Sequence, residues 1–123
     1  MKRDLEVCFS PVMYNRYEDP EAITVVVDIF RATTAICTAF DYGVHKIIPV
    51  GTVEEAREYK DKGYLIAAER DGQVLDFADF GNSPFNFMKE GLDGKTIVYS
   101  TTNGTRAVQM ASSSAKVLIG AFI

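Results

Sequence analysis

From Ile23 onward, short runs of apolar, mostly β-branched residues alternate with segments of helical pattern. Such alternation is typical of a parallel sheet covered by helices, because parallel strands need long connections between them. We therefore expect one α/β domain over residues 1–123, with three layers, a mostly parallel or mixed sheet, and helices on both faces. The pattern predicts strands near 5–9, 23–28, 46–50, 64–68, 96–100 and 116–120, and helices near 33–42, 53–62, 84–90 and 104–112.

A polar loop follows the predicted strand 96–100 and leads into the predicted helix 104–112. Backbone N–H groups at a helix start attract anions, and a glycine such as Gly104 lets the backbone approach a ligand closely. Arg106 adds a planar group suited to phosphate, sulfonate or carboxylate. The competing interpretation is a capped helix start, with Thr102 or Asn103 as the N-cap. The candidate binding residues here are Thr101, Thr102, Asn103, Gly104, Thr105 and Arg106.

A second loop places Asp28 at the end of a strand and Arg31 three residues later. The run from Ile23 to Val27 is almost continuously apolar, as expected for a strand buried on both faces. Thr33 or Thr34 can then cap the following helix. Ligands of open α/β sheets bind beyond the carboxyl ends of the strands, which favours a functional site here. The alternative is an Asp28–Arg31 ion pair that only orders the loop.

Two further loops have a similar character. Glu69 and Arg70 follow a short apolar run and precede Gly72, so both charges are expected near a strand end. In the other loop, Asn82 or Ser83 is a candidate N-cap, because the proline that follows suits a first helical turn. Structural capping alone is the more favoured interpretation of that last loop.

Charge and hydropathy exclude several classes of function. The chain has 13 basic and 17 acidic residues and a net charge of −4. This balance argues against broad binding to nucleic acids or anionic membranes, so any anion site must be local. No run approaches the roughly 20 apolar residues of a membrane span, and no signal-peptide core follows the charged start. We expect a cytoplasmic protein.

The motifs together resemble the 2-phosphosulfolactate phosphatase family. They occur in the family's order and at about its spacing, and the resemblance covers nearly the whole chain. Family members are roughly twice as long, so the chain is expected to correspond to their N-terminal half. Its apolar last run agrees with that expectation. The segments that carry the resemblance are Val26-Val-Asp-Ile-Phe-Arg-Ala-Thr-Thr34, Ala68-Glu-Arg70, Phe80-Gly-Asn-Ser-Pro84, Thr101-Thr-Asn-Gly-Thr-Arg106 and Val117-Leu-Ile-Gly120.

The resemblance implies a magnesium-dependent phosphatase that converts 2-phospho-3-sulfolactate to 3-sulfolactate and phosphate. In methane-producing archaea this step belongs to coenzyme M synthesis. Magnesium is often held by only one or two carboxylates together with phosphate and water. Asp28 and Glu69 are the candidate metal ligands, and with Arg31 they are the candidate catalytic residues. The candidate substrate-binding residues are Thr33, Thr34, Arg70, Asn82, Ser83 and the loop residues 101–106.

Several alternatives remain open at the level of sequence. We favour attack by water, with Asp28 as metal ligand or general base, over an aspartyl-phosphate intermediate on Asp28. A non-enzymatic phosphate- or anion-binding module, and an inactive fragment of the phosphatase, compete with the enzyme hypothesis. The partner is expected to be a small phosphoester. The sequence also leaves a homo-oligomer open.

Overall fold

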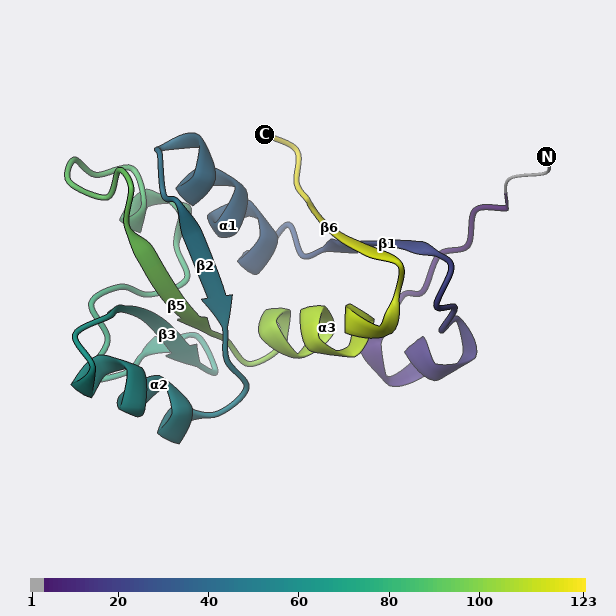
Figure 1. Ribbon diagram of the computed structural model, residues 1–123, viewed down its shortest axis with the longest axis horizontal. Helices are drawn as coiled ribbons and strands as arrows, with labels where there is room; N and C mark the ends of the chain where they lie inside the picture. The colour runs from purple at the N-terminus through teal and green to yellow at the C-terminus, as the bar shows by residue number, and fades with distance from the viewer. Residues whose placement is uncertain (1–3) are drawn as a thin grey trace.

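The computed structural model describes residues 4–123 and confirms an α/β fold (Figure 1). The order of its helices and strands follows the predicted alternation. Among the described residues, no helix has the length and apolar character needed to span a membrane. The elements are η1 (Pro11–Arg16), β1 (Ile23–Val27), α1 (Ala32–Asp41), β2 (Lys46–Pro49), α2 (Val53–Asp61), β3 (Leu65–Arg70), β4 (Gln73–Val74), η2 (Pro84–Asn86), β5 (Thr96–Ser100), α3 (Gly104–Met110), η3 (Ala111–Ser113) and β6 (Lys116–Gly120).

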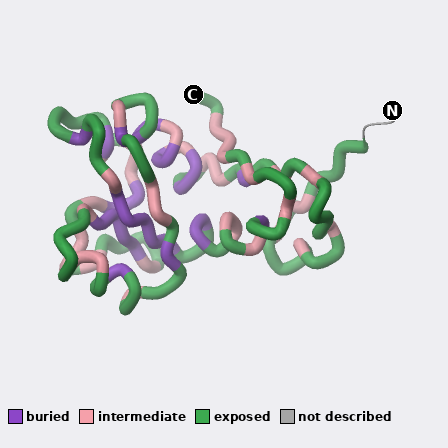
Figure 2. Tube along the Cα trace, viewed as in Figure 1, coloured by how far each residue is buried: buried purple, intermediate pink, exposed green. Residues whose placement is uncertain are grey.

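Four strands form one sheet in the order β2-β5-β3-β4, and helices cover both of its faces. Strands β2, β5 and β3 are parallel, while the short β4 pairs antiparallel with β3. Successive side chains of a strand point to opposite faces, so Ile97 packs toward α1 and Val98 toward α2. Most buried residues lie in and around this sheet (Figure 2). The predicted three-layer arrangement is found here.

Strands β1 and β6 pair in parallel as a separate two-stranded sheet. The prediction that residues 23–27 are buried on both faces is wrong. Val26 is buried, whereas Ile23, Val25 and Val27 on the opposite face are exposed. Helix α1 packs against β6 of this small sheet, while the face that carries Ile23, Val25 and Val27 stays open to solvent. The apolar run at Ile23–Val27 therefore predicted the strand correctly, but it did not predict that one face of the strand is exposed.

Two other predicted elements are wrong. Residues 5–9 form no strand, because they pair with no neighbouring strand and lie largely exposed. The predicted helix 84–90 is only the single 3-10 turn η2, Pro84–Asn86. It ends where Phe87 N–H donates to Pro84 O and the Phe87 ring enters the core against Phe80 and Tyr99. Burial of one aromatic ring thus decides where this helical segment stops.

Asp79 joins the loop before η2 to the core sheet and to α2. Its Oδ1 lies 2.6 Å from Lys60 Nζ, and its Oδ2 accepts a hydrogen bond of 2.8 Å from Ile66 N–H. Burial by itself would raise the pKa of Asp79, but the hydrogen bonds from Lys60 and Ile66 together lower that pKa below its ordinary value. A lowered pKa in the folded state means that ionised Asp79 stabilises the fold.

We predict that the effect of Asp79→Asn on stability depends on pH. The contribution of ionised Asp79 is present above its unfolded pKa of about 4 and is lost as pH falls through the lower folded value. Thermal unfolding should therefore show a larger loss at pH 7 than at pH 3. The control Asp76→Asn removes an exposed ion pair with Arg57 and should change stability little at either pH. Equal losses for Asp79→Asn at both pH values would contradict the prediction.

Candidate active site

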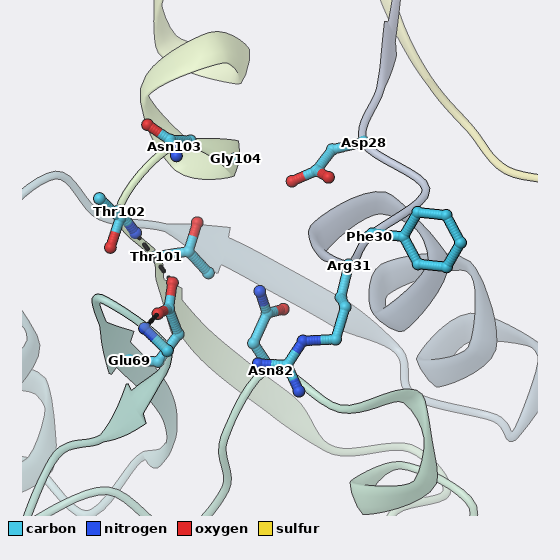
Figure 3. Close-up of a pocket in the computed structure, with 10 residues that line it drawn as sticks. Asp28, Phe30, Arg31, Glu69, Asn82, Thr101, Thr102, Asn103 and Gly104 are labelled. Atoms are coloured by element: carbon cyan, nitrogen blue, oxygen red, sulfur yellow. Dashed lines mark hydrogen bonds between the residues drawn. The ribbon is translucent and has the colours of Figure 1, made fainter.

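A small polar cavity of about 190 Å³ lies where β1, β3 and β5 end (Figure 3). Asp28 follows β1, Glu69 lies near the end of β3, and Thr101 follows β5. The cavity thus collects loops from both sheets at the carboxyl ends of their strands, the position that ligands of α/β proteins favour. Its volume is below the range of sites for drug-sized ligands and suits a small molecule. The lining residues are Asp28, Phe30, Arg31, Glu69, Gly72, Asn82, Thr101, Thr102, Asn103 and Gly104.

Glu69 is buried, with 6% of its surface exposed, and backbone donors hold its carboxylate. Oε1 accepts a hydrogen bond of 3.0 Å from Thr102 N–H, and Oε2 accepts one of 2.9 Å from Gly72 N–H. Gly72 lies in the tight turn between β3 and β4, where Asp71 and Gly72 have φ values of 52° and 80°. Glu69 therefore fixes both this turn and the loop after β5 around the cavity, and each oxygen keeps a second lone pair.

Asp28 organises the start of α1. Its Oδ2 accepts a hydrogen bond of 3.3 Å from Ala32 N–H, and its backbone N–H donates to Thr33 Oγ1 at 2.7 Å. The prediction that Thr33 or Thr34 caps this helix is wrong, because α1 begins at Ala32 and Thr34 Oγ1 donates to Ile29 O. Asp28 itself occupies the anion-attracting position at the helix start. Its other oxygen, Oδ1, takes part in no hydrogen bond within residues 4–123.

Arg31 lines the same cavity but does not pair with Asp28. Within residues 4–123 no ion pair joins the Arg31 guanidinium to the Asp28 carboxylate, so the alternative of an Asp28–Arg31 pair is wrong. Figure 3 shows the side chain of Arg31 running toward Asn82 and away from the Asp28 carboxylate. The guanidinium is therefore available to an anion in the cavity.

The loop after β5 holds its shape through contacts between Thr101 and Thr105. Thr105 N–H donates to Thr101 Oγ1 at 3.2 Å, and Thr105 Oγ1 donates to Thr101 O at 3.0 Å. Asn103 is the N-cap of α3, as one alternative predicted, although its side chain makes no capping hydrogen bond. Gly104 packs against α1 so closely that a Cβ there would lie 2.3 Å from the Cβ of Ala32. This glycine lets α1 and α3 meet beside the cavity.

Several of the candidate residues do not line the cavity. Arg70 donates to Glu69 O at 2.6 Å and to Ser100 Oγ at 2.8 Å, so its guanidinium binds the sheet rather than the cavity. Arg106 is exposed on α3, outside the lining. The cavity brings together Asp28, Arg31, Glu69, Asn82, Thr101, Thr102, Asn103 and Gly104, and its lining does not include Thr33, Thr34, Arg70, Ser83, Thr105 or Arg106.

Two lining residues were not among the sequence candidates. Phe30 lies between Asp28 and Arg31, and no local pattern set it apart from a structural aromatic residue. Gly72 follows the charged residues Glu69, Arg70 and Asp71, and the charges alone do not indicate that it lines a cavity. The sequence does carry an indication of its position, because Asp-Gly between two β-type segments is typical of a tight hairpin turn. Recognition of that hairpin would have predicted β4 and placed Gly72 beside Glu69.

The donor set of the cavity fits a magnesium ion. Asp28 and Glu69 offer carboxylate oxygens, the hard ligands that Mg²⁺ prefers, and a phosphate ligand would contribute more oxygens. Across residues 4–123 there is no group of three or more His, Cys, Asp or Glu placed to hold a metal. A site with few protein ligands is what Mg²⁺ commonly uses at phosphate substrates, since it retains several waters.

The chain is similar to one known protein family over nearly its whole length. A family model described as 2-phosphosulpholactate phosphatase matches residues 8–123. A "probable 2-phosphosulfolactate phosphatase" of Clostridium beijerinckii is 38% identical over 127 residues, which cover 100% of this chain and 52% of that protein. Proteins of the same name from Clostridium novyi and Thermotoga maritima are 40% and 43% identical, over 100% and 80% of this chain and 53% and 43% of theirs. The chain spans about half the length of these relatives.

Proposed function

The chain belongs to the 2-phosphosulfolactate phosphatase family, and from this premise we propose that its cavity binds 2-phosphosulfolactate and supports hydrolysis of the phosphoester. The observation that carries the proposal is the combination of carboxylates and anion-binding groups around one small polar cavity. A site that only bound anions would gain nothing from carboxylates that face the anion. A hydrolase that uses a divalent cation needs them.

Arg31, Asn82 and the loop after β5 are the proposed contacts to the substrate. The substrate carries a phosphate, a sulfonate and a carboxylate, and each of these groups accepts several hydrogen bonds. Arg31 offers a fork of N–H donors, and Asn82 offers an amide. Phosphoryl transfer depends mainly on such positioning and on neutralising the charge of the phosphoryl oxygens.

The charge balance of the lining supports a magnesium requirement. The charged lining residues are Asp28, Glu69 and Arg31, so the protein presents two negative groups and one positive group to a strongly anionic substrate. A bound Mg²⁺, held by Asp28 and Glu69, would offset this repulsion and withdraw charge from the phosphoryl group. Glu69 would contribute through the lone pairs that its hydrogen bonds to Gly72 and Thr102 leave free.

Asp28 Oδ1 is proposed as the general base, because it is the carboxylate oxygen without a partner in the described residues, and Oδ2 is then the oxygen that would bind Mg²⁺. It accepts a proton from water as the water oxygen bonds to phosphorus and the bond from phosphorus to the ester oxygen breaks. The departing alkoxide takes a proton from solvent and leaves as 3-sulfolactate beside inorganic phosphate, and Asp28 returns its own proton to solvent. General base catalysis of this kind contributes about 10²- to 10⁴-fold.

Magnesium-dependent release of phosphate is the test of this function. We predict that the 123-residue chain releases phosphate from 2-phosphosulfolactate with Mg²⁺ and stops when a chelator is added. The full-length relative from Clostridium beijerinckii, assayed in parallel, serves as the reference for the longer polypeptide. Release by the relative alone would mean that the part of the relative outside the matched region is needed for catalysis. Tight phosphate binding without Mg²⁺, and no release by either protein, would favour an anion-binding module instead.

A further inference from the structure

Tyr99 is outside the lining of the cavity but contacts one of its lining residues, Asn82. It belongs to β5, only 1% of its surface is exposed, and its ring packs against Phe87 in the core. Its hydroxyl donates a hydrogen bond to Asn82 Oδ1 and lies 3.5 Å from Ala32 O. Asn82 is itself 8% exposed and reaches the cavity. A buried tyrosine thus links the core sheet to a proposed substrate contact.

The hydroxyl of Tyr99 has one proton and two nearby acceptors. Ala32 O lies in the first turn of α1, where helical hydrogen bonding supplies it with a donor, and 3.5 Å is a long distance for an O–H···O bond. Asn82 Oδ1 is the closer acceptor. The proton of Tyr99 therefore goes to Asn82, and the amide oxygen is turned to the core.

The orientation of an asparagine amide decides what it offers to a ligand. With Oδ1 held by Tyr99, the Nδ2 group of Asn82 faces the cavity, as Figure 3 shows. An NH₂ group donates hydrogen bonds and accepts none, so this orientation favours anions. The opposite orientation would place a carbonyl oxygen toward the phosphate, sulfonate or carboxylate of a substrate.

We propose that Tyr99 is a positioning residue that fixes the Asn82 amide with its NH₂ group toward the cavity, as a donor to an anionic group of the substrate. The inference rests on the proposed function and extends it to a residue that touches no substrate. Burial, and then the nearby negative charges of Glu69 and Asp28, raise the pKa of Tyr99, while Arg31 lowers it. The hydroxyl therefore keeps its proton throughout the pH range of an assay.

Tyr99→Phe is the central variant, and inorganic phosphate in the presence of Mg²⁺ is the probe. The change keeps the ring and removes one oxygen. We expect a dissociation constant for phosphate roughly three- to tenfold higher, the size of one lost hydrogen bond. Tyr59→Phe makes the same chemical change in a ring that packs against Tyr64 on the other side of the core sheet, and should bind phosphate as the parent does.

A double-mutant comparison separates positioning from general structural support. Once Asn82→Ala has removed the amide, Tyr99→Phe should alter phosphate affinity less than twofold, because there is nothing left to orient. A merely structural role of Tyr99 would persist in that background. A full further loss in the double variant, or unchanged affinity in Tyr99→Phe alone, overturns the inference.

The ¹³C chemical shift of the Asn82 side-chain carbonyl provides a readout that needs no phosphate. It should move in Tyr99→Phe and stay constant in Tyr59→Phe, since only the first loses the hydrogen bond to Oδ1. An unchanged shift overturns the inference. If the shift moves but the parent chain binds no phosphate, the positioning contact stands and the proposed function fails. This readout also covers the case in which Asn82→Ala does not fold.

Discussion

Asp28→Asn is expected to lower magnesium-dependent phosphate release by about 10²- to 10⁴-fold, the contribution typical of a positioned general base. The amide cannot accept a proton from water, and it is a poorer magnesium ligand than a carboxylate. Its oxygen can still accept the hydrogen bond from Ala32 N–H that Asp28 Oδ2 accepts. Because this acceptor for Ala32 N–H is kept, α1 should remain intact.

The measurement is the initial rate of phosphate release, with thermal unfolding of the same samples. Asp61→Asn, at the end of α2 and on the surface, makes the same chemical change as a control and should keep the parent rate. A fully active Asp28→Asn chain with the parent stability would remove Asp28 from the mechanism altogether. If acid-quenched reactions of the parent chain contain protein phosphorylated at Asp28, the aspartyl-phosphate route replaces direct attack by water.

Gly104→Ala should destabilise the fold although alanine favours helices more than glycine does. The new Cβ would lie 2.3 Å from Ala32 Cβ and 3.1 Å from Thr101 Oγ1, so α3 and α1 must move apart. Such overpacking typically costs about 1–3 kcal/mol, which outweighs the gain of up to about 1 kcal/mol in helix propensity. Because Gly104 lines the cavity, this movement of α3 should also disturb the cavity.

Urea unfolding and phosphate affinity together test this prediction. In the control Gly51→Ala, the new Cβ would meet only the end of the flexible Gln109 side chain, at 3.1 Å, and stability should change by less than about 0.5 kcal/mol. Ala32→Gly removes the methyl group that clashes. It should cost less in the Gly104→Ala background than in the parent chain. Additive losses would show that the two helices do not compete for this space.

The order of strands and helices could be predicted because it depends on local periodicity. The apolar run at Thr96–Ser100 and the amphipathic segment at Val53–Asp61 each indicated their element directly. The predictions of secondary structure failed where contacts between distant residues determine whether an element forms. Residues 5–9 have a β-type pattern but no partner strand, and the helical pattern after Pro84 stops because Phe87 is drawn into the core.

The gathering of polar residues at the ends of β1, β3 and β5 could also be predicted, since chain order and strand direction place them there. Which of these residues face the cavity depends on contacts between distant parts of the chain. The Glu69 carboxylate accepts a hydrogen bond from Thr102 N–H, 33 residues away, whereas the guanidinium of its neighbour Arg70 donates to Ser100 Oγ. The apolar run that contains Tyr99 predicts a core strand, but gives no sign that the Tyr99 hydroxyl donates to Asn82 Oδ1. The spacing of apolar and polar residues along the chain determines local conformation. The hydrogen-bond partner of each polar group depends instead on which atoms the folded chain brings within hydrogen-bond distance.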